Sequence, residues 1–338
     1  MGRVVDAVDR GQQRTSVLGF PIAVIYKYSD DQGNYLAAII TYYAFIAIFP
    51  LLLLGSSILG FVLQGNDSLR ESVLDSALSQ FPIIGDQLGR PEGLQGSAAG
   101  LVVGSLVALY GALGLGTAIQ NALNTAWAVP RNKRPNPVLL RLRSLMLLAT
   151  AGVALLAISL ASALSQATVF GEQIASYRWP IVLLTVAVMT AVLSLLMQLG
   201  VAGTHQLRHA WPGALVIAVL WQTLQVIGTA YVTGILAETS EMNQTFALVL
   251  GLIGLLWIAA VMGMIGIEVN VVLSRRLWPR ALMAAFSDKS PLTDADRRAY
   301  TSYARAQRHK RAQDIKVTFD QSSPLTEPMR LPFDDPED

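Results

Sequence analysis

Six long apolar stretches constrain the fold of this chain more than any other feature of its sequence. Each reaches or exceeds the roughly 20 residues that a helix needs to cross the hydrocarbon core of a bilayer. They cover residues 35–63, 98–120, 145–165, 179–201, 211–236 and 246–274. Only 14% of the 338 residues are charged, against about 25% in ordinary soluble domains. We therefore expect an all-α integral membrane protein with six transmembrane helices.

Basic residues are divided unevenly among the segments that connect these stretches. The N-terminal segment, the second-to-third and fourth-to-fifth connections and the C-terminal tail together hold 22 of the 25 Lys and Arg residues. The other three connections hold only Arg70, Arg90 and Arg178. Because cytoplasmic loops carry the excess of Lys and Arg, we expect both termini in the cytoplasm.

Composition along the chain predicts three parts. Residues 1–34 form a cytoplasmic or interfacial N-terminal segment, residues 35–277 the transmembrane domain, and residues 278–338 a basic, partly disordered cytoplasmic tail. The apolar segment 17–28 is short and contains Pro21, which suits a helix lying in the inner interface. Apolar residues recur at helical spacing within segment 64–97, which predicts an extracytoplasmic amphipathic helix.

The tail contains one recognisable helix start. Thr293 and Asp296 form a capping box in front of a run rich in Arg and Lys. A basic helix on the cytoplasmic side would be attracted to anionic lipid. A cytoplasmic partner protein is a second hypothesis for the tail.

Glu268 is the one acidic residue inside the predicted spans. An ionisable residue at that depth is by default a candidate functional site, here for proton coupling or for binding a substrate headgroup. The alternative is a structural ion pair, with Arg141, Arg143 or Arg208 as the partner. Asn270 lies about 200° round the helix from Glu268, so the two side chains should occupy different faces.

Other polar residues in the spans are candidates for lining a substrate path. They are Tyr42, Tyr43 and Pro50 in the first span, Gln120, Asn121 and Asn124 at the end of the second, and Gln222 and Gln225 in the fifth. Gln120 and Asn124 continue a row of small residues at every fourth position from Gly100 to Gly116. Such a row also favours close helix packing, within one bundle or between copies of the chain.

Several kinds of catalytic site are not supported by the sequence. Without cysteine, the chain has no thiolate nucleophile and no disulfide framework. His205 and His209 lack the adjacent Glu of a zincin, and Asp294 and Asp296 lie in a tail expected to be flexible, where they would be poor ligands for a nuclease metal. We expect no metal, no cofactor, no nucleic-acid partner and no enzymatic activity.

Four sequence motifs resemble the BrkB/YihY family of bacterial inner-membrane proteins, once described as ribonuclease BN. They are YLAAIITYYAFIAIFPLLLL at 35–54, NALNTAWAV at 121–129, WPGALVIAVLW at 211–221 and LIGLLWIAAVMGMIGIEVNVVL at 252–273. The resemblance covers about residues 26–277. One departure is Ala47-Ile48-Phe49-Pro50, where the family often has Ser-Leu-Phe-Pro.

The resemblance implies a multi-pass protein of the bacterial inner membrane with six spans and both termini inside. It also implies a connection with export of lipids or lipid-linked precursors, and the ribonuclease label is regarded as a misassignment. The main hypothesis is thus a transporter of a lipid or other amphiphile without its own ATPase. The alternatives are a non-transporting scaffold that recruits a cytoplasmic partner or anionic lipid, and a membrane-bound hydrolase or nuclease.

Overall fold

All regular secondary structure in the part of the chain that the computed structural model describes is helical; this part comprises residues 9, 11–62, 98–166, 178–203, 206–235, 241–282 and 291–319. The chain divides into two compact units. The helical unit contains Val24–Val129 and Lys133–Arg275, and the terminal unit contains Met1–Ala23, Pro130–Asn132 and Arg276–Asp338. The predicted helix in segment 64–97 and the end of the tail lie outside the described residues.

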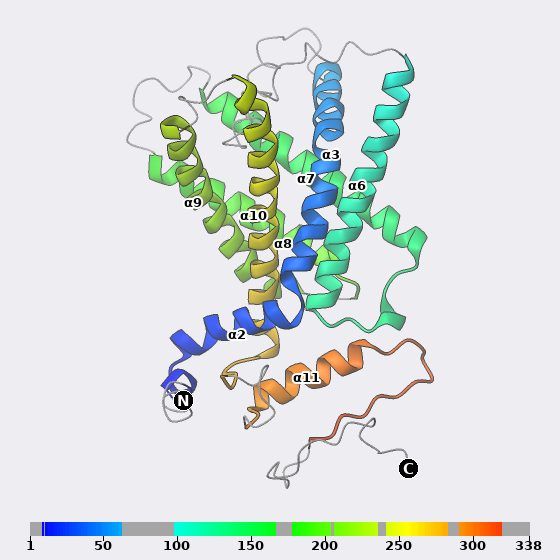
Figure 1. Cartoon of the computed structure of the whole chain (residues 1–338), viewed down its shortest axis with the longest axis vertical. Coiled ribbons are helices and arrows are strands. Elements are labelled where there is room, and N and C mark those ends of the chain that lie inside the picture. Colours follow the sequence, from blue (N-terminus) through cyan, green and yellow to red (C-terminus); the bar gives the residue numbers. More distant parts are fainter. Residues whose placement is uncertain are drawn as a thin grey trace, which may run out of the picture. The chain divides into compact units, whose positions relative to one another are not determined.

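Among the described residues, six long helices build the helical unit (Figure 1). They are α3 (Gly33–Val62), α6 (Ala98–Ala126), α7 (Pro137–Gln166), α8 (Arg178–Gly200), α9 (Trp211–Ile235) and α10 (Glu241–Arg275). Each helix packs against the next one in the chain, and α10 returns to pack against α3. The six helices therefore form a closed ring.

These helices coincide with the six predicted apolar stretches, although three boundaries differ by five residues or more. α6 continues past Gln120 to Ala126, while α7 begins at Pro137 and α10 at Glu241, before their apolar runs. The α7 boundary follows from a local cap: the Asn136 side chain accepts a hydrogen bond of 2.8 Å from the Leu139 amide, with Pro137 at the first helical position. Arg141 and Arg143, which we expected in the connection before the third span, therefore lie on α7.

Length and composition make the chain a membrane protein. Within the described residues, three helices are long and apolar enough to cross a bilayer, over Pro137–Ala154, Val182–Gly200 and Val249–Arg275. α3 and α9 contribute the shorter apolar stretches Gly33–Ile48 and Trp211–Ile227. Large apolar side chains such as Val153, Leu183 and Val226 point outward, as expected where lipid rather than water surrounds the helices.

Small residues allow the helices to approach closely. A Cβ on Gly116 of α6 would lie 2.5 Å from the Ser144 Cβ of α7. Ala112 and Gly116, from the predicted small-residue row, are both buried. The side chains of Gly104 and Ala108 lie outside the described set.

The terminal unit joins segments from both ends of the chain. Phe20, on α2 (Ser16–Asp30), packs edge-on against Trp278 with ring centroids 5.6 Å apart. The Asp9 carboxylate accepts a hydrogen bond of 2.8 Å from the Leu282 amide. Helix α11 (Asp294–Ala306) is attached through a buried ion pair between Asp296 and Arg280.

The predicted capping box at Thr293 and Asp296 is confirmed, because both of its reciprocal hydrogen bonds are present. The expectation that Asp296 lies in a flexible tail is wrong. Its carboxylate is fully buried, where it accepts hydrogen bonds from Arg280 and from the Ala281 amide. The sequence pattern predicted the start of α11 but not the buried ion pair between Asp296 and Arg280 that attaches this helix.

Candidate functional site

A buried cluster of three charged residues lies within the helical unit. Lys27 is on the last turns of α2, Asp31 follows that helix directly, and Glu268 lies on α10. All three side chains are almost completely excluded from solvent. We call these residues the charge cluster.

The Lys27 ammonium is the centre of the cluster. Its Nζ donates to Asp31 Oδ2 and, over 3.0 Å, to the main-chain oxygen of Ala126 at the end of α6. It lies 3.4 Å from Glu268 Oε2. One cation thus links α2, α6 and α10.

A sharp turn positions Lys27 and Asp31. Asp31 lies one helical turn after Lys27, and the Asp31 amide donates to the Lys27 oxygen over 3.0 Å. Gln32 then adopts φ 56°, a left-handed conformation that ends α2 and allows α3 to begin at Gly33. A Cβ on Gly33 would lie 2.5 Å from the Tyr28 ring, so glycine permits the close approach of the two helices.

The C-terminus of α6 receives two further cations besides Lys27. Arg275 donates to the Trp127 oxygen and lies 5.9 Å from the Trp127 ring centre. Arg134 donates to the Val129 oxygen over 3.2 Å. Ala128, at φ 44°, closes the helix with Schellman hydrogen bonds, in which the Ala128 and Val129 amides donate backward to Thr125 and Asn124. Three basic side chains therefore neutralise the partial negative charge of one helix end.

The charges within the cluster do not balance. One ammonium faces two carboxyl groups, and neither Glu268 oxygen meets a donor with hydrogen-bonding geometry among the described residues. Burial raises the pKa of Asp31 above its ordinary value, and Lys27 opposes this rise. Burial of an uncompensated charge is costly. With an ammonium on Lys27, the cluster is electroneutral when its two carboxyl groups share one proton.

Asn270 organises the opposite face of α10. Its Oδ1 accepts from the Gly213 amide over 2.7 Å, and its Nδ2 donates to the Ala210 oxygen over 3.0 Å and contacts the Met197 sulfur at 3.2 Å. Asn270 therefore caps the N-terminus of α9 from a neighbouring helix. The prediction that Glu268 and Asn270 occupy different faces is confirmed.

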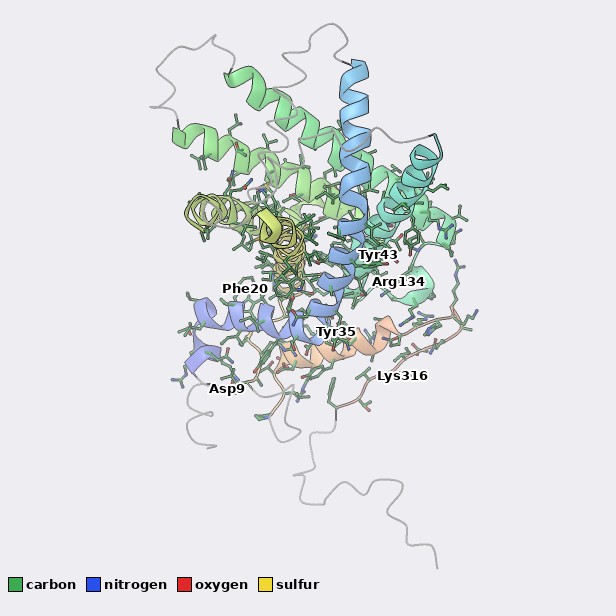
Figure 2. The ribbon with its side chains drawn as sticks, turned by 45° about the horizontal axis from the view of Figure 1, so that its top comes forward. Asp9, Phe20, Tyr35, Tyr43, Arg134 and Lys316 are labelled. Carbon is green, nitrogen blue, oxygen red and sulfur yellow. The ribbon has the colours of Figure 1, made fainter. Side chains whose placement is uncertain are left out.

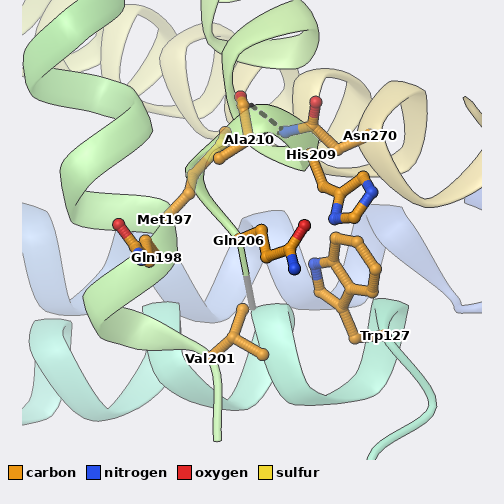
Figure 3. Close-up of a pocket in the computed structure, with 8 residues that line it drawn as sticks. All are labelled: Trp127, Met197, Gln198, Val201, Gln206, His209, Ala210 and Asn270. Atoms are coloured by element: carbon orange, nitrogen blue, oxygen red, sulfur yellow. Dashed lines mark hydrogen bonds between the residues drawn. The ribbon is translucent and has the colours of Figure 1, made fainter. Parts of the chain in front are cut away.

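A small cavity adjoins Asn270 (Figure 3). In the close-up, Trp127, Gln206 and His209 gather on one side of it, and the dashed line joins Asn270 to Ala210. Its volume of about 10 Å³ is about that of one water molecule. It is far too small for a lipid.

Replacing Asn270 by Leu should lower the free energy of unfolding by about 2 kcal/mol, because the buried Gly213 amide and Ala210 carbonyl would lose their partner. Asn136→Ala, which removes an exposed cap on α7, should cost only about 1 kcal/mol. Chemical unfolding of the full chain in detergent micelles would compare the two variants. Equal costs would contradict the role of Asn270 as a buried cap.

The predicted amides of α6 also connect helices or helix ends. Gln120 Nε2 donates to Ser144 Oγ over 2.9 Å and to the Leu140 oxygen over 3.0 Å, both on α7. Asn124 Oδ1 accepts from the Ala202 amide over 2.8 Å, and exposed Asn121 accepts from Arg134 over 3.2 Å. That these amides line a substrate path remains a prediction.

The predicted tyrosines lie elsewhere on the bundle. Tyr42 is 56% exposed, and its ring contacts Tyr43, which in turn lies 6.0 Å from Tyr110 of α6. Pro50 falls within α3, with its side chain outside the described set, and Gln222 and Gln225 are half-buried on α9. The described contacts of Glu268 include none of these residues.

Sequence reasoning missed the partners of Glu268. We expected Arg141, Arg143 or Arg208, and this is wrong, because the ion pair is with Lys27. The signal available in the sequence was a Lys and an Asp one helical turn apart, at the end of an otherwise apolar segment. Within the described ranges, no group of three or more acidic or His residues is placed to hold a metal ion.

Comparison with known proteins supports the resemblance found in the motifs. No curated protein and no solved structure matched the chain. A family model matched residues 24–288, a range that includes every residue of the charge cluster and the Asn270 cap. The chain belongs to the family described as virulence factor BrkB.

Proposed function

We propose that the protein is a membrane transporter that exports a lipid or another amphiphilic envelope component, coupled to proton uptake and release by the charge cluster. The observation that carries the proposal is Glu268, which is fully buried on a long apolar helix beside one cation and a second carboxyl group. Ionisable groups at such positions commonly serve as proton relays or substrate sites in transporters. The proposal includes no catalytic step and no ATPase.

The proposed arrangement is multi-pass, with all six long helices crossing the bacterial inner membrane and both termini in the cytoplasm. The closed ring of α3 and α6 to α10 supports six crossings, and the uneven distribution of basic residues supports the orientation. In this arrangement residues 35–277 form the membrane domain, flanked by cytoplasmic segments 1–34 and 278–338. The charge cluster then lies near the cytoplasmic end of the bundle, beside the end of α6.

The cluster suggests how protonation could change the bundle. With one shared proton, Lys27 balances the remaining carboxylate and holds the end of α6 against α10. Loss of the proton leaves a buried net negative charge, which water entering between these helices would stabilise. Proton release would thus favour opening at this end, as in an alternating-access cycle.

The test is transport by the full chain in proteoliposomes, using fluorescent phospholipids with an imposed pH gradient. Glu268→Gln should abolish the dependence of transport on the gradient, since the amide cannot release a proton. The same substitution at Glu241, the first residue of α10, is the control and should leave transport unchanged. Melting curves of both variants separate loss of function from loss of folding.

The possible results distinguish the hypotheses. Unchanged gradient dependence in Glu268→Gln would remove this residue from the mechanism. No movement of any lipid by the unmodified protein would exclude lipid transport and favour the scaffold hypothesis. In that case, pulldowns with and without residues 287–338 would show whether the tail recruits a partner.

A further inference from the structure

The terminal unit has an exposed basic surface that the proposed transport mechanism does not use. Along α11 and the segment that follows it, the exposed charged side chains between residues 298 and 316 are Arg298, Arg305, Lys310, Arg311 and Lys316, with Asp314 as the only exposed acid. Figure 2 labels Lys316 in this segment, beyond the end of α11. We call residues 298–316 the basic segment.

The segment belongs to a folded unit rather than to a free tail. The start of α11 is attached by the buried Arg280–Asp296 pair, and Arg280 lies 5.5 Å from the Tyr300 ring centre. Beyond the helix, the Arg308 oxygen accepts from the Asn132 amide over 3.1 Å. The start of the segment and Arg308 are therefore attached to the rest of the terminal unit.

The same unit exposes an apolar pair on α2. Val17 is 82% exposed and Leu18 58%, whereas the next two residues pack inward, Gly19 near Pro279 and Phe20 against Trp278. Basic side chains together with exposed aliphatic ones are typical of segments that lie at a lipid interface. A nucleic-acid surface would give the aliphatic pair no partner.

Chain connectivity keeps this unit close to the bilayer. Only Asp31 and Gln32 separate α2 from the apolar helix α3, and Arg276 follows directly after the last residue of α10. Such covalent connections to apolar helices give the unit a high effective concentration at the membrane surface. A modest attraction for each charge is then sufficient to hold it there.

We propose that the terminal unit docks on the anionic headgroups of the membrane in which the protein sits, through the basic segment, with Val17 and Leu18 in the interface. The attraction comes from the negative surface potential of anionic lipids. It should therefore weaken as salt screens that potential. This docking is independent of the transport proposal and would hold for a protein that transports nothing.

The chain's lack of cysteine permits a direct test. Ala312 is exposed within the basic segment, and Ala312→Cys would be the sole thiol of the full chain. A fluorophore on this thiol, in nanodiscs containing lipid with a spin label on its headgroup, is quenched when the segment lies on the surface. We expect strong quenching in phosphatidylglycerol discs, weak quenching in phosphatidylcholine discs, and loss of the difference at high salt.

Removing a basic residue and removing the acidic residue should change the docking of the segment in opposite directions. Each of Arg305→Gln, Lys310→Gln and Arg311→Gln should lower the ratio of docked to undocked protein by about fivefold, whereas Asp314→Asn should raise it. Quenching that is equal in the two lipids, or unaffected by all three substitutions together, would overturn the proposal. If the triple variant unfolds the terminal unit, the salt dependence of the otherwise unmodified Ala312→Cys protein decides between docking and no docking.

Discussion

Lys27→Met should lower the free energy of unfolding of the helical unit by about 3–5 kcal/mol, as expected when one partner is removed from a buried ion pair. Methionine fills similar space but provides no charge. Asp31 and Glu268 would then lie together without their cation, and the Ala126 carbonyl would lose the donor that now lies 3.0 Å away. Chemical unfolding in detergent micelles, followed by tryptophan fluorescence, measures the change.

Two further variants make this prediction specific to the cluster. Lys133→Met removes the same charge from an exposed position and should change stability by less than about 0.5 kcal/mol. The triple variant Lys27→Met, Asp31→Asn, Glu268→Gln removes all three charges and should recover most of the loss, because a neutral cluster has no uncompensated charge. A triple variant as unstable as Lys27→Met would show that packing, rather than charge, is what Lys27 contributes.

The positions of the six long helices could be predicted because the thickness of a bilayer fixes the length of an apolar run. The start of α7 could not be predicted from hydropathy, because the cap at Asn136 determines it and because Arg141 and Arg143 lie on the helix within its first turns. Long basic side chains can extend from a helix end toward water, so they do not mark where the helix begins.

The candidate site was predicted in part. The free-energy cost of placing a carboxyl group inside a membrane span was enough to identify Glu268 as unusual. Its partner could not be identified, because Lys27 reaches it only through the turn at Gln32 and the approach of α2 to α10. In the same way, the sequence placed Asn270 on a different face from Glu268, but only the packing of α9 against α10 shows that this face caps a helix.

Two of the motifs that carry the family resemblance meet at one point, where Gly213 of α9 contacts Gly266 of α10. A Cβ on Gly213 would overlap the Gly266 carbonyl oxygen and would lie 2.7 Å from the Asn270 amide nitrogen. A Cβ on Gly266 would overlap the Ile217 side chain. The two helices therefore approach so closely that only glycine fits, as at other small-residue crossings in membranes.

Gly213→Ala should accordingly lower the free energy of unfolding by about 3 kcal/mol, the upper end of the usual range for overpacking. The cost is high because the obstructing atom is a backbone carbonyl, which cannot rotate away as a side chain can. Separating the helices would also stretch the hydrogen bond from the Gly213 amide to Asn270. Unfolding in micelles provides the measurement.

Two other glycines of α10 serve as matched controls. A Cβ on Gly254 or Gly263 would meet no atom within 4 Å. Alanine at either position should stabilise the protein by up to about 1 kcal/mol, because glycine within a helix loses more backbone freedom on folding. If Gly213→Ala were as stable as these two variants, α9 and α10 could not be in contact at this crossing. The assignment of Asn270 as a cap of α9 depends on the same approach of the two helices, so it would then be wrong as well.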